Sequence, residues 1–130
     1  MQDLRAYVAY YVPQLSGPAA VDAWHSLVEA GPAALPYVVA AFPATSDPAA
    51  RLVLVQIIAA YRSEEAIPFF AACLQQTDTE VWKAALDGLV SLGGRGALDV
   101  LTAARDTAPP EKREWVSEAV DQIRETRGLG

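Results

Sequence analysis

The chain has 130 residues, of which 52% are hydrophobic and 20% are charged. At this length we expect one domain covering residues 1–130, and so apolar a composition excludes long disordered stretches. The formal net charge of −6 disfavours nucleic acid as a partner, because binding of nucleic acid begins with a basic stripe.

The sequence also indicates a compartment. Polar residues and prolines interrupt the apolar runs before they reach the roughly 20 residues of a membrane span. Asp3, Arg5 and several tyrosines make the N-terminus a poor secretory signal. The single cysteine, Cys73, suits a reducing compartment. We therefore expect a cytoplasmic protein that does not bind membranes.

Helix signals recur along the chain. Asp47-Pro48 and Thr79-Glu80 are typical of helix starts, and Gly31 is typical of a helix end. The predicted helices cover residues 2–13, 18–30, 33–43, 48–62, 64–76, 79–92, 95–106 and 110–126.

Residues 51–62, RLVLVQIIAAYR, are the one ambiguous stretch. Alone, this run of β-branched residues resembles a buried strand. However, residues 49–61 align with residues 81–93, in which apolar residues recur at the three- and four-residue steps of a helix face. The stretch is therefore predicted to be helical.

Two kinds of segment alternate along the chain. The first kind comprises ALPYVVAAF (34–42), AIPFFAACL (66–74) and ALDVLTAAR (97–105). The second kind comprises AAVDAWHSLVEAG (19–31), AARLVLVQIIAAY (49–61) and VWKAALDGLVSLG (81–93), with a weaker copy at 115–125. Leu35, Ile67 and Leu98 align at spacings of 32 and 31 residues, so the repeating unit is a pair of short helices.

This pattern resembles HEAT-like repeats, especially the short kind first noticed in phycocyanobilin lyases. The resemblance rests on a first helix such as EAIPFFAACLQ (65–75), an aspartate in the turn at Asp78 and a second helix such as EVWKAALDGLVSLG (80–93). It implies an all-α, right-handed α-α superhelix (a solenoid) of about four helix pairs.

The resemblance also divides the expected single domain. Residues 1–17 are assigned by inference to a capping helix, residues 18–126 to the repeats and residues 127–130 to a frayed tail. A polar last helix fits the end of a repeat stack. The expected state is a monomer or a weak end-to-end oligomer.

One position departs from the family pattern. The family usually places an arginine directly after the valine of the second helix, where it forms a ladder with turn aspartates. Ala50 and Trp82 hold that position here, and Arg51 and Lys83 follow one step later. Either the register shifts by one residue or another interaction replaces the ladder.

The chain is poor in catalytic groups. His25 is the only histidine, and Cys73 lies in an apolar helix, where a small buried residue is the commoner role. One histidine and one cysteine cannot assemble a metal site, and no carboxylates have the spacing of a calcium loop. The glycine-rich residues 91–98 fit a plain turn or a phosphate-binding loop. We expect no enzyme, no cofactor and no metal.

The resemblance places the second helices on the concave side of the solenoid. Their apolar residues allow two interpretations: Leu54 and Ile58 are either core residues of a central helix or part of a groove for a partner helix or loop. The predicted groove comprises Trp24, His25, Arg51, Ile58, Trp82, Lys83, Leu86 and Asp87. Trp82 is the strongest single candidate for an anchor.

The architecture and the lack of catalytic groups together predict a non-catalytic protein–protein interaction module, of adaptor or scaffold type, for an unidentified protein partner. Two alternatives stay open. The small acidic chain also resembles inhibitor or immunity proteins that neutralise a toxin or an enzyme. A lyase-like HEAT-repeat protein would instead hold a small molecule on the concave face.

Overall fold

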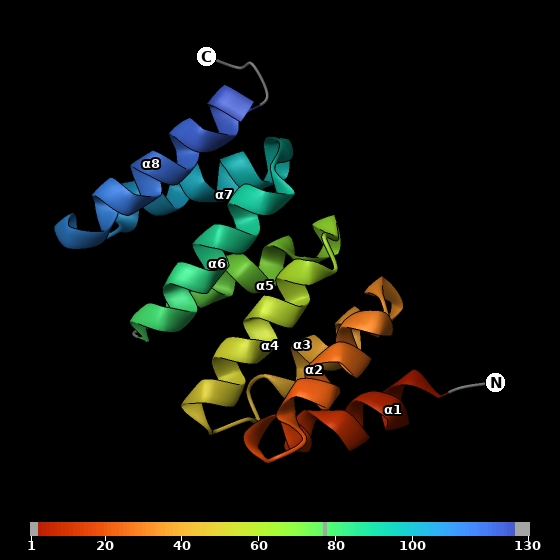
Figure 1. Ribbon diagram of the computed structural model, residues 1–130. Helices are drawn as coiled ribbons and strands as arrows, with labels where there is room; N and C mark the ends of the chain where they lie inside the picture. Colours follow the sequence, from red (N-terminus) through yellow and green to blue (C-terminus); the bar gives the residue numbers. More distant parts are fainter. Residues whose placement is uncertain (1–2, 77, 127–130) are drawn as a thin grey trace. The chain divides into compact units, whose positions relative to one another are not determined.

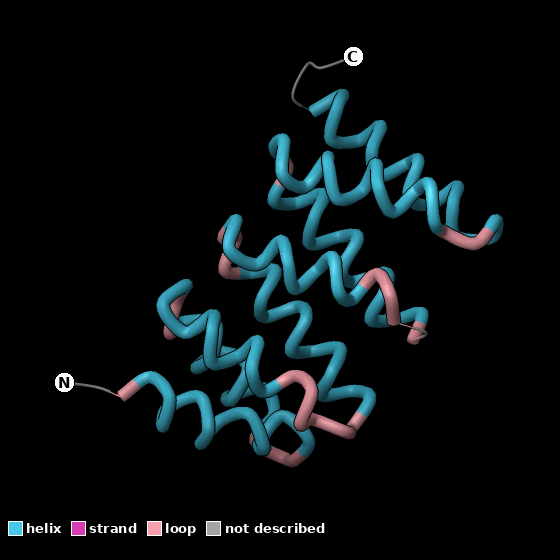
Figure 2. Tube along the Cα trace, turned by 180° about the vertical axis from the view of Figure 1, so that it is seen from behind, coloured by secondary structure: helices cyan, strands magenta, loops and turns pink. Residues whose placement is uncertain are grey.

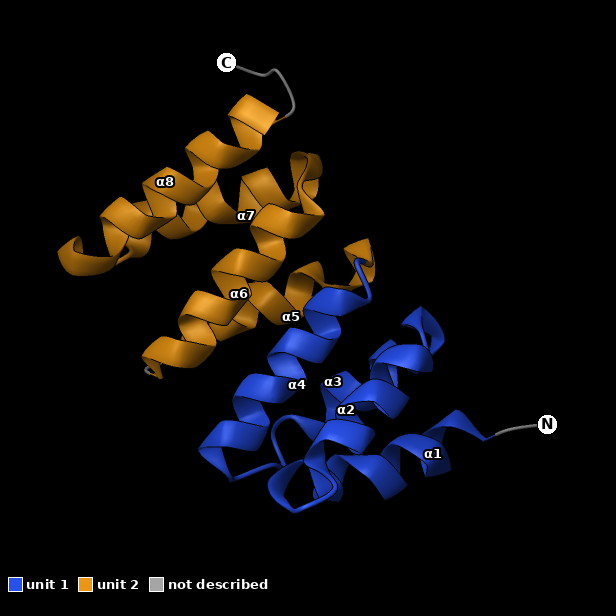
Figure 3. Cartoon of the chain, viewed as in Figure 1, with its two compact units in different colours: residues 1–62 blue, residues 63–130 orange. Residues whose placement is uncertain are grey.

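The computed structural model describes residues 3–76 and 78–126, and all the regular structure in these residues is helical (Figures 1 and 2). The chain divides into two compact units, Met1–Arg62 and Ser63–Gly130 (Figure 3). That the two units form a single domain stays a prediction. The frayed tail expected at residues 127–130 lies outside the described residues.

Unit 1 is built from helix pairs. Its helices are α1 (Leu4–Tyr11), η1 (Val12–Ser16), α2 (Ala20–Glu29), η2 (Pro32–Ala34), α3 (Leu35–Ala41) and α4 (Pro48–Ala60), where η marks a short 3-10 helix. Helix α1 packs against α2 and α3, and α4 packs against the same two helices.

Unit 2 repeats the arrangement. Its helices are η3 (Glu64–Ala66), α5 (Ile67–Cys73), α6 (Thr79–Leu92), α7 (Gly94–Thr107) and α8 (Pro110–Thr126). Helix α5 packs against α6 and α7, and α8 packs against both α6 and α7. Gly96 of α7 lies against α5, because a Cβ built on it would come within 2.9 Å of the Cδ1 atom of Ile67.

Residues 51–60 of the ambiguous stretch are helical, as the repeat alignment predicts, and form most of α4, which ends before Tyr61 and Arg62. The carboxylate of Asp47 accepts a hydrogen bond from the backbone N–H of Ala50, which fixes the start of the helix. The side chains of Leu54 and Ile58, for which the sequence allows two roles, are completely buried. They therefore belong to the core.

Two first helices of the pairs, α3 and α5, are shorter than predicted. Helices α3 and α5 have seven residues each, and each is preceded by a 3-10 turn. Pro36 and Pro68 lie in the first turns of these helices and have no N–H to donate. The regular α-helical hydrogen bonds therefore begin after each proline. Pro13 lies just beyond the end of α1 and has no N–H to continue its α-helical ladder, so α1 ends at Tyr11 and the 3-10 helix η1 follows.

Two tyrosines complete the C-terminal end of α2. The hydroxyl of Tyr7 donates to the carbonyl oxygen of Ser26 at 2.9 Å, and the hydroxyl of Tyr61 donates to that of Leu27 at 2.6 Å. The last carbonyls of a helix lack the regular donors within it. Tyr61 supplies a donor to the Leu27 carbonyl, and Tyr7 adds one to the Ser26 carbonyl, which also accepts from the backbone N–H of Ala30. Burial, and to a lesser extent the neighbouring Tyr7, raises the pKa of Tyr61 to about 12.

Candidate functional site

The predicted groove residues fall equally into the two units and differ in accessibility. The side chains of Ile58, Trp82 and Leu86 are buried, those of Trp24, Arg51 and Lys83 are half-buried, and those of His25 and Asp87 are exposed. The three large apolar residues Ile58, Trp82 and Leu86 are 0%, 3% and 5% exposed, so they are not contact surface. The partner-binding role of the others stays a prediction.

Arg51, one step after the position where the family pattern has arginine, bonds to backbone carbonyls of the preceding turn. Its Nη1 atom donates to the carbonyl oxygens of Phe42 at 3.2 Å and Thr45 at 2.9 Å. Its guanidinium also lies 4.0 Å from the centre of the Phe42 ring. Arg51 therefore ties the turn after α3 to α4. The turn aspartate Asp78 instead caps α6, accepting from the N–H groups of Glu80 and Val81.

The exposed large aromatic side chain in the described part of unit 2 is Trp115 of α8, which packs against the buried Trp82 of α6. The ring of Trp115 is 43% exposed and its centre lies 6.2 Å from that of Trp82. The Nζ atom of Lys83 lies 4.5 Å from the centre of the Trp115 ring, and that of Lys112 lies 5.0 Å from the centre of the Trp82 ring. We call Trp82, Lys83, Lys112 and Trp115 the tryptophan face.

Helical spacing assembles this face. Trp82 and Lys83 are neighbours near the start of α6, and Lys112 and Trp115 are three residues apart on one side of α8. Sequence reasoning found the two α6 residues and missed the two α8 residues, because the last helix is so charged that it fits a solvated cap. A tryptophan within such a helix is the signal that could have revealed the face.

Unit 1 has an apolar hollow beside α2 and α4. It has a volume of about 380 Å³ and is lined by Leu15, Ala20, Val21, Trp24, His25 and Val53. Val21 is 69% exposed, and the Trp24 and His25 rings meet edge to face at 4.9 Å. The sequence predicted Trp24 and His25 for a binding surface and did not include Val53 in it. Val53 is only half-buried.

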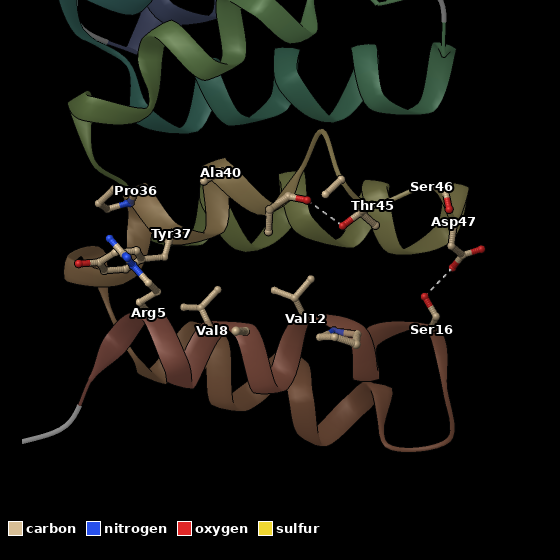
Figure 4. Close-up of a pocket in the computed structure, with 14 residues that line it drawn as sticks. Arg5, Val8, Val12, Ser16, Pro36, Tyr37, Ala40, Thr45, Ser46 and Asp47 are labelled. Carbon is tan, nitrogen blue, oxygen red and sulfur yellow. Dashed lines mark hydrogen bonds between the residues drawn. The ribbon is translucent and has the colours of Figure 1, made fainter.

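A larger groove runs between α1 and α3 (Figure 4). It has a volume of about 800 Å³ and is lined mainly by small and apolar side chains. Arg5 lies at one end beside Tyr37, and Ser16 and Asp47 close the other end (Figure 4). The predicted site residues include none of these, because the resemblance places the binding surface on the second helices. We call this cavity the α1–α3 groove.

The side chains best suited to catalysis or metal binding lie far apart in the sequence and in different units. His25 is exposed on α2, and the Cys73 thiol is buried in α5 of the other unit. In residues 3–76 and 78–126, no three His, Cys, Asp or Glu side chains gather closely enough to hold a metal ion. None of the helices in this part of the chain combines the length and the apolarity that crossing a membrane requires.

Comparison with known proteins agrees with the helix pairs. A family model of HEAT repeats matches residues 35–121, which run from the start of α3 into α8. Searches of curated proteins and of solved structures gave no match. The family match covers more than half of the chain, and the structure within it consists of the packed helix pairs α3–α4, α5–α6 and α7–α8. The chain therefore belongs to the HEAT-repeat family.

Proposed function

We propose that the chain is a non-catalytic protein-binding module, of adaptor type, whose helix pairs stack as a right-handed superhelix and which works in the cytoplasm. The HEAT repeats support this proposal, because stacked helix pairs offer extended surfaces for partners. The exposed position of the only histidine and the buried position of the only cysteine favour binding over catalysis.

The observation that carries the proposal is the accessible ring of Trp115. Tryptophan is enriched among the residues that contribute most to binding energy at protein interfaces. This ring is restrained before any partner arrives, because Lys83 and Trp82 contact it. A restrained side chain loses less conformational entropy on binding, so more of its contact energy contributes to affinity.

The residues that the sequence predicted for the groove keep an indirect role in this proposal. Trp82 supports Trp115 from within α6, and Lys83 covers part of its ring. Trp24 and His25 rim the hollow of unit 1, which is a smaller surface of the same apolar and aromatic kind. Trp82 and Leu86 are poor positions for a test, because their substitution would disturb the core.

The test is a paired capture experiment. Wild type, Trp115→Ala and Tyr10→Ala are immobilised, and the proteins that each retains from a native lysate are identified by mass spectrometry. Tyr10, which is 65% exposed on α1 of the other unit, is the matched control. We expect a partner that wild type and Tyr10→Ala retain and that Trp115→Ala loses, with the helical circular dichroism of all three unchanged. Equal capture by all three would contradict the assignment of the tryptophan face.

A further inference from the structure

We propose that the α1–α3 groove is a second docking site, which takes an amphipathic α-helix of a partner protein with the C-terminal end of that helix at Arg5. This groove shares no residue with the tryptophan face. The inference therefore does not rest on the function proposed for that face.

The shape of the groove suits a helix. Helices α1 and α3 run side by side in the same direction, because Arg5 meets Tyr37 at one end and Ser16 bonds Asp47 at the other (Figure 4). Ser16 follows Arg5 by eleven positions in the sequence, so the groove is about 16 Å long, or about three helical turns.

The walls of the groove suit the apolar stripe of such a helix. Val8 and Val12 lie between the two helices, and the walls carry small residues that let another backbone approach: Ala9, Ala40, Ala41 and Ala44. An amphipathic helix presents apolar side chains at three- and four-residue steps, which fit a groove of this kind.

The charges at the two ends of the groove set the direction of the helix. The Arg5 guanidinium lies 5.8 Å from the centre of the Tyr37 ring, which holds the positive charge at that end. At the opposite end, the Oδ2 atom of Asp47 accepts from the Ser16 hydroxyl at 3.2 Å. A helix is partially positive at its N-terminus and partially negative at its C-terminus. Its C-terminus therefore belongs at Arg5 and its N-terminus at Asp47, antiparallel to both α1 and α3.

A partner protein fits this groove better than a second copy of the chain. The large apolar side chains exposed in the described residues are Tyr10, Val21 and Trp115, each on a different helix. None of these helices therefore offers the stripe of large apolar residues, about three turns long, that the groove would bury. The proposed occupant is therefore a helix of another protein.

The first test uses a displayed library of helical peptides of about 14 residues, or roughly four turns. The library has a variable apolar face and, in the first and last turns, a free choice between glutamate and lysine. It is selected on wild type, on Ala9→Trp, which fills the groove, and on Ala6→Trp. Ala6 and Ala9 are both exposed on α1, but only Ala9 lines the groove, so Ala6→Trp is the matched control.

We expect peptides to be enriched on wild type and on Ala6→Trp. The same peptides should bind Ala9→Trp about tenfold or more weakly, because overpacking a fitted contact lowers the affinity by about this factor. The enriched peptides should carry glutamate in the last turn. Equal enrichment on all three proteins, or enrichment on none, would overturn the proposal. Self-association of the wild type that Ala9→Trp removes would overturn it in favour of a second copy.

The direction of the helix is tested with Arg5→Glu. This change places an acidic residue in the first turn of α1, where it is compatible with the helix, and reverses the charge at the end of the groove. We expect the preference in the last turn of the bound peptides to change from glutamate to lysine. An unchanged preference would overturn the proposed direction.

Discussion

At the scale of single residues, the clearest structural devices are the tyrosines at the end of α2. The Ser26 carbonyl accepts from the Tyr7 hydroxyl and also from the backbone N–H of Ala30, whereas the Leu27 carbonyl accepts from the Tyr61 hydroxyl. Removing the two hydroxyls should therefore have unequal consequences.

Tyr61→Phe should lower the free energy of unfolding by about 1–3 kcal/mol, because it leaves a buried carbonyl without its partner. Tyr7→Phe is the matched control and should cost about 1 kcal/mol or less, because the Ser26 carbonyl keeps its backbone donor. Urea denaturation followed by circular dichroism measures both. A larger loss in Tyr7→Phe would contradict this account of the α2 terminus.

Tyr61 also predicts a dependence on alkaline pH. Its pKa is raised to about 12 by burial, from the ordinary value of 10.0 that it recovers on unfolding. The folded state thus favours the neutral phenol. The resulting contribution of Tyr61 to the free energy of unfolding is complete below pH 10 and is lost as the pH rises through 12. The difference in stability between wild type and Tyr61→Phe should shrink over that interval. A constant difference in urea denaturation between pH 9 and about pH 12 would contradict the origin of the shift.

At the scale of elements, the turns between helices limit what can be substituted. Gly31, between α2 and the 3-10 turn η2, has φ of 80° and ψ of −177°. This region is almost restricted to glycine. Gly17, which follows η1, has φ of −131° and ψ of −169°, an extended conformation that any residue adopts.

Gly31→Ala should lower the free energy of unfolding by about 1–3 kcal/mol through backbone strain alone, because nothing lies within 4 Å of the Cβ it would gain. Gly17→Ala should be neutral or stabilise the protein by up to about 1 kcal/mol. Thermal unfolding of the two variants compares them directly, and equal melting temperatures would refute the strain.

The sequence predicts helices well because their signals are local. Periodicity, an aspartate before a helix and proline in its first turn are read within a few residues, and the repeat corrected the one misleading stretch in α4. The roles of Arg51 and Trp82 were not predictable in this way. Arg51 contacts a turn six to nine residues earlier, and Trp82 meets Lys112 and Trp115 from a helix about 30 residues later. Such contacts follow from packing, which one sequence does not reveal.

At the scale of the whole molecule, each unit carries an accessible surface that differs from the acidic average of the chain. Unit 2 has the tryptophan face with its two lysines, and unit 1 has the α1–α3 groove with Arg5 at its end. The formal net charge of −6 disfavours nucleic acid as a partner for these cations. We therefore propose protein partners for the two surfaces.

The affinity of the captured partner for wild type and two variants tests the central claim most directly. Isothermal titration calorimetry should show that Trp115→Ala weakens binding by about tenfold or more, as for an interface anchor. Tyr10→Ala should leave the affinity unchanged. Equal affinities for Trp115→Ala and wild type would contradict the claim that this HEAT-repeat protein binds its partner through the tryptophan face.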